Sequence, residues 1–250
     1  MASPEVQLVP VGLAALGAAV ISAIWTVAQL PAIGWMAALA YLTASTAILL
    51  RALRRRRTAR FGAANVITAT RSALVGIITG LVAASFVEPV SVPLLIGLVV
   101  PALVLDAVDG RVARRTDSIT ELGARFDMEV DAFLLFGLSA YVAQDLGPWV
   151  LAIGLMRYAF VVAGWLLPWL RGQLPPRYWR KVVTAVQGIA LTLAASGVVV
   201  PGIAGVLVGV ALALLVESFG RDVLWLALHG RRSGARPGAR RTRPAEVDAS

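Results

Sequence analysis

The chain has 250 residues, of which 58% are hydrophobic and 15% are charged, and its mean hydropathy is +0.79. A soluble domain carries nearer a quarter of charged residues, so the composition excludes an ordinary soluble protein and predicts an integral membrane protein. The absence of cysteine excludes disulfide and thiolate–metal chemistry. The net charge is +9, but the basic runs abut apolar segments and lack interleaved aromatic residues, which favours contact with anionic membrane lipids over nucleic acid.

Eight apolar segments follow one another along the chain, and we interpret each as a membrane-spanning helix, which makes the fold all-α. They are residues 11–30, 31–50, 71–87, 94–109, 124–143, 148–170, 182–200 and 203–228. Arginine-rich stretches follow every second segment, whereas the turns EPVSVP, QDLGP and VPG carry no Lys or Arg. The positive-inside rule therefore places both termini on the cytoplasmic side of the inner (plasma) membrane.

Composition also divides the chain into four parts. Residues 1–50 hold two N-terminal transmembrane helices, and residues 51–70 form a basic juxtamembrane segment with six arginines between positions 51 and 60. Residues 71–229 contain the other six helices. Residues 230–250 form an Arg/Gly/Pro-rich cytoplasmic tail that we expect to be disordered.

Four aspartates lie where the fourth and fifth apolar segments meet the cytoplasmic side. Asp106 and Asp109 are three residues apart, and Asp127 and Asp131 are four apart, so each pair occupies one face of a helix. Four unpaired carboxylates would repel one another, and two divalent ions would balance their charge. Because carboxylate oxygens suit Mg²⁺, Mn²⁺ or Ca²⁺, we predict a metal site that acts on a phosphorylated substrate.

Neighbouring residues support such a site. Gly110 and Gly123 allow the backbone to approach a ligand closely, and Arg114, one turn beyond Gly110, is placed to bind a diphosphate. Ordinary ion pairs are the alternative explanation of Asp109 and Asp127. Their partners would be Arg111, Arg114 or Arg125.

This pattern resembles the signature of the CDP-alcohol phosphotransferase (CDP-alcohol phosphatidyltransferase) family. The matching residues are Asp106-x-x-Asp109-Gly110-x-x-Ala113-Arg114, then eight residues, Gly123, three residues, Asp127, three residues and Asp131. The resemblance covers roughly residues 62–229. It implies a catalytic core of six transmembrane helices and a homodimer, and the two N-terminal helices are additional to that core.

The resemblance implies a phospholipid-synthesising transferase. Such an enzyme moves a phosphatidyl group from CDP-diacylglycerol to the hydroxyl group of a small polar alcohol, with release of CMP. The four aspartates would hold two Mg²⁺ ions, or Mn²⁺, and Asp131 would also be the general base. The contacts with the CDP-lipid would come from Asn65, Thr68, Gly110, Ala113, Arg114, Thr120 and Gly123.

Asn65 and Thr68 belong to the pattern Asn65-x-x-Thr68-x-x-Arg71, which resembles the segment before the first core helix of the family. We interpret Arg71 as a residue of the membrane boundary.

The acceptor site is the least complete part of the pattern. Arg157 lies within an apolar segment and matches an arginine for the acceptor phosphate in phosphatidylglycerophosphate and phosphatidylinositol-phosphate synthases. A charge partner for a core aspartate is the alternative role. Lys181 begins a K-x-x-T-x-x-Q pattern similar to the glycerophosphate enzymes, but Trp165 follows Gly164 where those enzymes carry a further arginine. This resemblance implies a phosphorylated acceptor, but the particular alcohol stays unassigned.

Two other classes stay open. A different Mg²⁺-dependent membrane transferase, such as an aromatic prenyltransferase, also binds a diphosphate, but its aspartate clusters lack the Gly-x-x-Ala-Arg spacing. A cation transporter would place carboxylates near the bilayer midplane and show an internal repeat.

The remaining acidic residues are interpreted as ion-pair partners. Glu129 would pair with an arginine such as Arg125, one turn earlier on the same helix. Glu217, Arg221 and Asp222 would form a local helical set near the end of the last apolar segment.

Overall fold

The computed structural model describes residues 4–56, 63–115, 121–172 and 178–233. Within these ranges the chain is all-helical, which confirms the predicted fold class, and it contains eight α-helices, two short 3-10 helices and no strand. The elements are α1 (Pro4–Ala28), α2 (Ala32–Arg56), α3 (Ala63–Ser85), α4 (Val92–Arg115), α5 (Glu121–Leu146), η1 (Pro148–Val150), α6 (Leu151–Leu166), η2 (Pro168–Arg171), α7 (Tyr178–Ala195) and α8 (Pro201–Ser233). The basic tail from residue 234 onward lies outside the described part.

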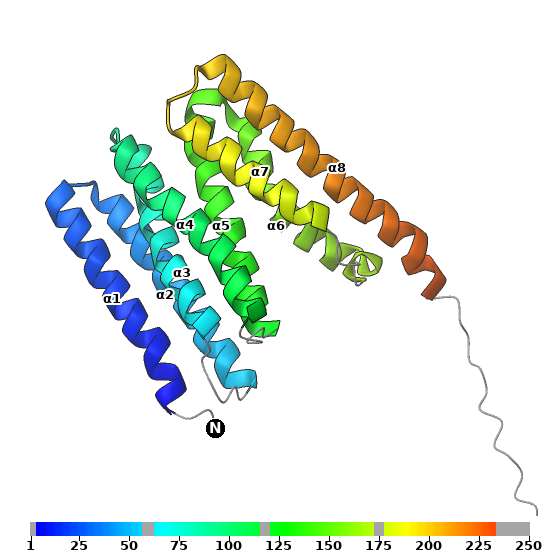
Figure 1. Cartoon of the computed structure of the whole chain (residues 1–250), viewed down its shortest axis with the longest axis horizontal. Helices are drawn as coiled ribbons and strands as arrows, with labels where there is room; N and C mark the ends of the chain where they lie inside the picture. Colours follow the sequence, from blue (N-terminus) through cyan, green and yellow to red (C-terminus); the bar gives the residue numbers. More distant parts are fainter. Residues whose placement is uncertain (1–3, 57–62, 116–120, 173–177, 234–250) are drawn as a thin grey trace, which may run out of the picture.

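Successive helices alternate in direction (Figure 1). The turns after α1, α3, α5 and α7 lie at one end of the bundle, and the helix ends that adjoin the arginine-rich stretches point the other way. Each predicted apolar segment corresponds to one α-helix. Helices α2, α3, α4, α5, α7 and α8 extend further than predicted at the arginine-rich end, whereas α6 ends at Leu166 and is followed there by η2. Residues 63–70, which the sequence placed ahead of a span, are the first two turns of α3, because alanine-containing polar sequence continues a helix readily beyond its apolar part.

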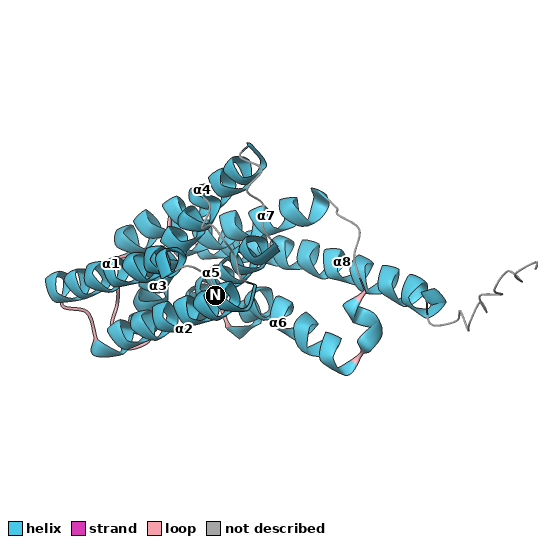
Figure 2. Ribbon diagram, turned by 90° about the horizontal axis from the view of Figure 1, so that it is seen from below, coloured by secondary structure: helices cyan, strands magenta, loops and turns pink. Residues whose placement is uncertain are grey.

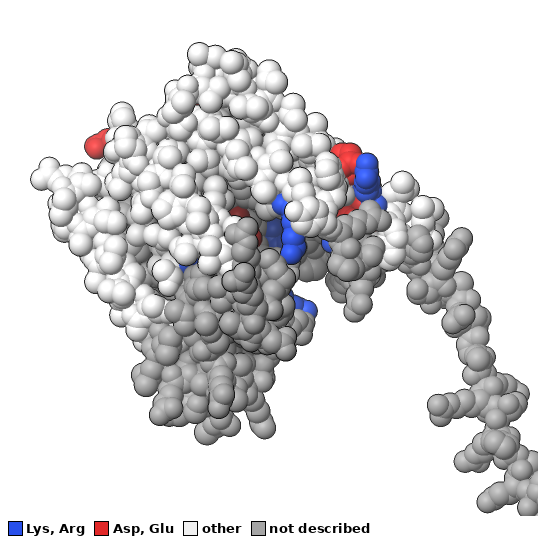
Figure 3. Space-filling model, viewed as in Figure 1, with Lys and Arg blue, Asp and Glu red and all other residues white. Residues whose placement is uncertain are grey.

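Five described helical stretches are long and apolar enough to cross a membrane, and α4 contains a shorter one at Val92–Val108. The five are Pro10–Ala28, Ala32–Arg51, Thr68–Ser85, Pro148–Leu166 and Pro201–Leu228. The first turns of α5 and α7 carry charged residues, which lowers their mean hydropathy. Figure 3 shows an upper surface almost free of charge, with acidic and basic side chains gathered in a hollow lower down and beside α8. The chain is therefore a multi-pass membrane protein.

Helix α5 lies at the centre of the bundle. It contacts α3 on one side and α6 and α7 on the other, as the view from below also shows (Figure 2). Val130, Leu134 and Leu138, spaced four residues apart, are each at most 2% exposed, so one face of α5 is fully covered. Residues near the start of α5 consequently lie where several helices meet.

The two N-terminal helices pack directly on α3. Gly34 of α2 faces Gly80 of α3, and a Cβ atom added at Gly80 would lie 2.6 Å from the main-chain oxygen of Gly34 and 2.5 Å from the ring of Trp25. The indole Nε1 of Trp25 donates a hydrogen bond to the main-chain oxygen of Pro31 at 3.1 Å, which fixes the ring in this contact. Backbone approaches backbone here, so α1 and α2 are an integral part of the bundle.

We expect Gly80→Ala to lower the free energy of unfolding by about 1–3 kcal/mol, because the added methyl group has no space between α2 and α3. Thermal unfolding in one detergent would measure the loss. Gly209→Ala in α8 is the matched control, because a Cβ there meets no heavy atom within 4 Å. Equal effects of the two substitutions would contradict this explanation of the α2–α3 contact.

Candidate active site

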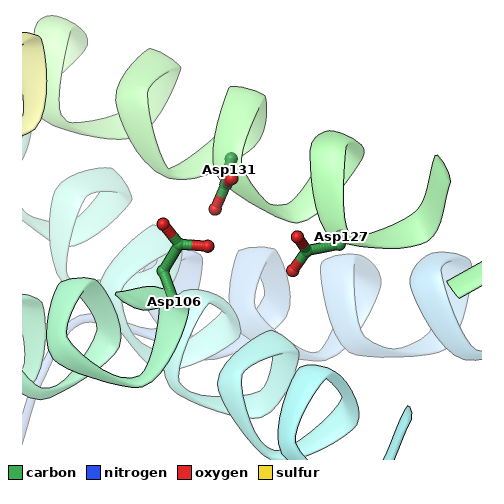
Figure 4. Close-up of side chains that lie close together, drawn as sticks. All are labelled: Asp106, Asp127 and Asp131. Atoms are coloured by element: carbon green, nitrogen blue, oxygen red, sulfur yellow. The ribbon is translucent and has the colours of Figure 1, made fainter. Parts of the chain in front are cut away.

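Three of the four predicted aspartates meet between α4 and α5. Asp106 comes from α4, Asp127 and Asp131 come from successive turns of α5, and their carboxyl groups point toward one another (Figure 4). One carboxylate oxygen from each residue lies within 4.8 Å of the other two. The side chains are 40%, 31% and 25% exposed in that order, so the cluster is open on one side and covered on the other. The four-residue spacing thus places Asp127 and Asp131 together, as predicted.

The structure describes the other predicted site residues less fully. Asp109 lies on α4, three residues after Asp106, but its side chain is outside the described part of the structure. The same holds for a group of residues at the ends of α3 and α4, namely Asn65, Gly110, Ala113 and Arg114. Thr120 belongs to a stretch that is not described, and Gly123 is partly buried in the first turn of α5.

A fully buried arginine of α3 binds all three carboxylates. The side chain of Arg71 is 0% exposed. Its Nη1 donates to Oδ1 of Asp106 at 2.6 Å, and its Nη2 donates to Oδ1 of Asp127 at 2.6 Å and to Oδ1 of Asp131 at 2.8 Å. The sequence pattern predicted a membrane-boundary position for Arg71 and not a place in the site. The sequence does contain a signal for this contact: Arg71 is a single charged residue in an apolar segment, and such a charge requires a partner.

Thr68 lies one turn before Arg71 on the same face of α3 and is also buried, at 3% exposed. The helix that carries the predicted Asn65-x-x-Thr68 pattern is therefore the helix that delivers the arginine to the carboxylates. Asp127 pairs with this arginine of α3, which the ion-pair alternative did not consider.

Among the described side chains of the cluster, carboxyl groups outnumber the cation that faces them. Arg71 is one guanidinium group against three carboxyl groups at a partly buried position, where solvent screens charge incompletely. Three carboxylate oxygens that converge from two helices form an all-oxygen donor set, which is the set that hard divalent cations prefer. The residues present therefore fit a divalent metal ion.

A second ion pair links α5 to α6 close to the cluster. Arg157 of α6 pairs with Glu129, which lies between the two aspartates of α5. The two helices approach closely at Gly154. A Cβ atom added there would lie 2.5 Å from Cα of Phe136, so no larger residue fits at this position. The prediction that Glu129 is an ion-pair partner is confirmed, and the partner that the structure gives is Arg157 of the neighbouring helix.

The predicted acceptor residue Lys181 lies exposed in the first turn of α7. No contact that the structure gives between described residues joins it to the aspartates. The local ion pair of Glu217 with Arg221 on α8 is confirmed. Asp222 instead pairs across helices with Arg180 of α7 at 3.3 Å, so these charges tie α8 to α7.

The chain is thus a helical membrane protein whose clustered carboxylates, at one end of the bundle, form a candidate metal-dependent site. The sequence profile of the CDP-alcohol phosphatidyltransferase family matches residues 61–217. The chain therefore belongs to this family, and it is a transferase of phospholipid synthesis that uses a CDP-alcohol. Comparisons with curated proteins and with solved structures found no match. The matched region contains α3, α4 and α5 with the whole cluster, and α1 and α2 precede it.

We expect Asp106→Asn and Asp127→Asn each to weaken Mn²⁺ binding by about tenfold or more, because each removes a ligand oxygen and a charge. The paramagnetic resonance signal of free Mn²⁺ over detergent-solubilised protein would measure the affinity. Asp145→Asn is the matched control, because Asp145 is an exposed aspartate at the opposite end of α5. Unchanged affinity in both cluster variants would rule out the cluster as the metal site.

Proposed function

We propose that the chain transfers a phosphatidyl group from CDP-diacylglycerol to the hydroxyl group of a small polar alcohol and releases CMP. The proposed acceptor is a phosphorylated alcohol. The convergence of Asp106, Asp127 and Asp131 at one end of an apolar bundle, inside the family-matched region, carries this proposal. The lipid part of such a substrate is compatible with the bilayer, and its diphosphate needs cations at the end of the bundle.

The four aspartates Asp106, Asp109, Asp127 and Asp131 are proposed to hold two Mg²⁺ ions, with Mn²⁺ as an alternative. Bound ions of this kind neutralise charge on phosphoryl oxygens. The protein contributes ligand oxygens from both α4 and α5, so the packing of these two helices fixes the position of the diphosphate.

Asp131 is proposed as the general base. It is the least exposed of the three described carboxylates, which keeps bulk water from competing with the acceptor hydroxyl. Asp131 would take the hydroxyl proton while the acceptor oxygen bonds to the phosphorus of the phosphatidyl group. The bond from this phosphorus to the bridging oxygen then breaks, and its electron pair leaves with CMP.

Residues at the converging ends of α3, α4 and α5 are proposed to bind the CDP part. Two of them support this: Thr68 is buried one turn from Arg71, and Gly123 lies one turn before Asp127. The proposed contact residues are Asn65, Thr68, Gly110, Ala113, Arg114, Thr120 and Gly123. We further propose that the site and both termini face the cytoplasm, where the arginine-rich stretches meet anionic lipids, and that the chain forms a homodimer.

Arg157 is proposed to bind the phosphate of the acceptor. Its guanidinium group is partly exposed, and its partner Glu129 places it within one helical turn of Asp127 and Asp131. A doubly charged phosphate is a stronger partner for arginine than a half-exposed carboxylate is. Lys181 is a second candidate, from the exposed start of α7.

CMP release tests the proposed reaction. We expect the protein in lipid nanodiscs with Mg²⁺ and CDP-diacylglycerol to release CMP with one of four acceptors: glycerol 3-phosphate, inositol phosphate, inositol or serine. Asp131→Asn should abolish release, whereas Asp145→Asn at the far end of α5 should not. Failure to release CMP with any acceptor, together with failure to bind CDP in the presence of Mg²⁺, would refute the proposal.

We expect Arg157→Gln to raise KM for a phosphorylated acceptor by about 10- to 100-fold and to leave kcat nearly unchanged, because a charge-assisted hydrogen bond to the phosphate is lost. Initial rates of CMP release over a range of acceptor concentrations would separate the two constants. Arg221→Gln, which removes a paired arginine from α8, is the control. An equal rise in KM for an uncharged acceptor would contradict phosphate binding by Arg157.

A further inference from the structure

We propose that Arg71 is the internal counter-cation of the carboxylate cluster, and that a divalent ion binds the cluster only by displacing the Arg71 guanidinium group. The inference rests on the metal-binding part of the proposed function. It goes further by assigning a residue that competes with the metal and thereby sets its affinity.

Arg71 occupies the space in which the carboxylates would hold a metal ion. Nη2 of Arg71 bridges Oδ1 of Asp127 and Oδ1 of Asp131 at 2.6 and 2.8 Å, and Nη1 lies 2.6 Å from Oδ1 of Asp106. Mg²⁺ binds carboxylate oxygens at about 2.0–2.1 Å. An ion held by these same three oxygens would fill the space that the two nitrogens occupy. The guanidinium group and a metal ion therefore compete for the same side of these oxygens.

The carboxylates of the cluster hold Arg71 in place. Its side chain is 0% exposed, and its contacts run through the two terminal nitrogens to the carboxylates and, at 3.3 Å, to the main-chain oxygen of Asp127. The third nitrogen, Nε, is buried and has no hydrogen-bond partner among the described residues. Among the described residues, the carboxylates that pair with this buried charge all belong to the cluster, and a buried charge without a partner is costly.

The carboxylates in turn are stabilised by Arg71. Oxygens of Asp106, Asp127 and Asp131 lie within 4.8 Å of one another, and at this distance like charges repel strongly in a partly buried place. Arg71 offsets part of this repulsion, so the cluster keeps its geometry without a metal ion. The same contacts must be given up when the ion binds, and the affinity for the ion is lower as a result.

Mn²⁺ binding to the full chain in detergent, without CDP-lipid or acceptor, tests the proposal. We expect Arg71→Gln to bind Mn²⁺ at least about tenfold more tightly than the unchanged protein. The substitution removes the guanidinium group that competes with the ion through charge-assisted hydrogen bonds to the carboxylates. The same variant should unfold at a lower temperature in EDTA and gain more from saturating Mg²⁺ than the unchanged protein does.

Two further variants make the test specific. Arg71→Lys keeps the positive charge but cannot bridge the carboxylates with two nitrogens, so we expect an intermediate gain in affinity. Arg157→Gln removes the same charge from a neighbouring ion pair and should change the affinity less than about twofold, since it leaves the cluster contacts intact.

Unchanged or weaker Mn²⁺ binding by Arg71→Gln, or by folded Arg71→Lys if Arg71→Gln does not fold, would overturn the proposal. So would an equal gain in Arg157→Gln, because the effect would then be one of net charge. CMP release is measured separately: a protein that releases CMP but shows no gain in Arg71→Gln contradicts this inference alone. A protein that shows the gain but never releases CMP contradicts only the proposed reaction.

Discussion

Repulsion among three carboxylates within 4.8 Å of one another is the constraint on which the arrangement of the core depends. Such a cluster is stable at the end of an apolar bundle only with cations beside it, and Arg71 supplies one from within the chain. The four side chains come from α3, α4 and α5, so none of these helices forms the site alone. Stability of the bundle and geometry of the site are therefore set by the same helix contacts.

The helices outside the cluster act by holding α3 and α5 in place. Tyr41 of α2 packs its ring against Phe133 of α5, with centroids 4.6 Å apart. Ser72, next to Arg71 on α3, donates a hydrogen bond to Ser45 of α2 at 3.3 Å. Although α2 precedes the family-matched region, it contacts both the helix that carries the arginine and the helix that carries two of the aspartates. The two additional N-terminal helices thus stabilise the site indirectly, because both pack against α3.

Local spacing made part of this structure predictable. The apolar segments follow from runs that are long enough to span a bilayer. The shared face of Asp127 and Asp131 and the ion pair of Glu217 with Arg221 follow from helical spacing over four residues. Arg71 reaches Asp131 across 60 positions of sequence, and such a contact depends on which helices are neighbours.

The ion pairs that sequence analysis missed have the same cause. Glu129 pairs with Arg157, 28 positions away, because a glycine brings α6 onto α5. Asp222 pairs with Arg180 because α7 lies against α8. Periodicity identifies a charge that needs a partner, but the packing of the helices selects the partner.

Different helices serve the two substrates in the proposed reaction. The CDP-lipid would be held by the ends of α3, α4 and α5, whose positions are coupled through Arg71 and the aspartates. The acceptor would be held by α6, which meets α5 through the small residue Gly154 and a partly exposed ion pair. Since exposed pairs contribute little to stability, Arg157 can exchange Glu129 for a ligand at small cost. In the proposed reaction, side chains of α6 would therefore change the choice of acceptor alcohol without moving the carboxylates that are proposed to bind the metal.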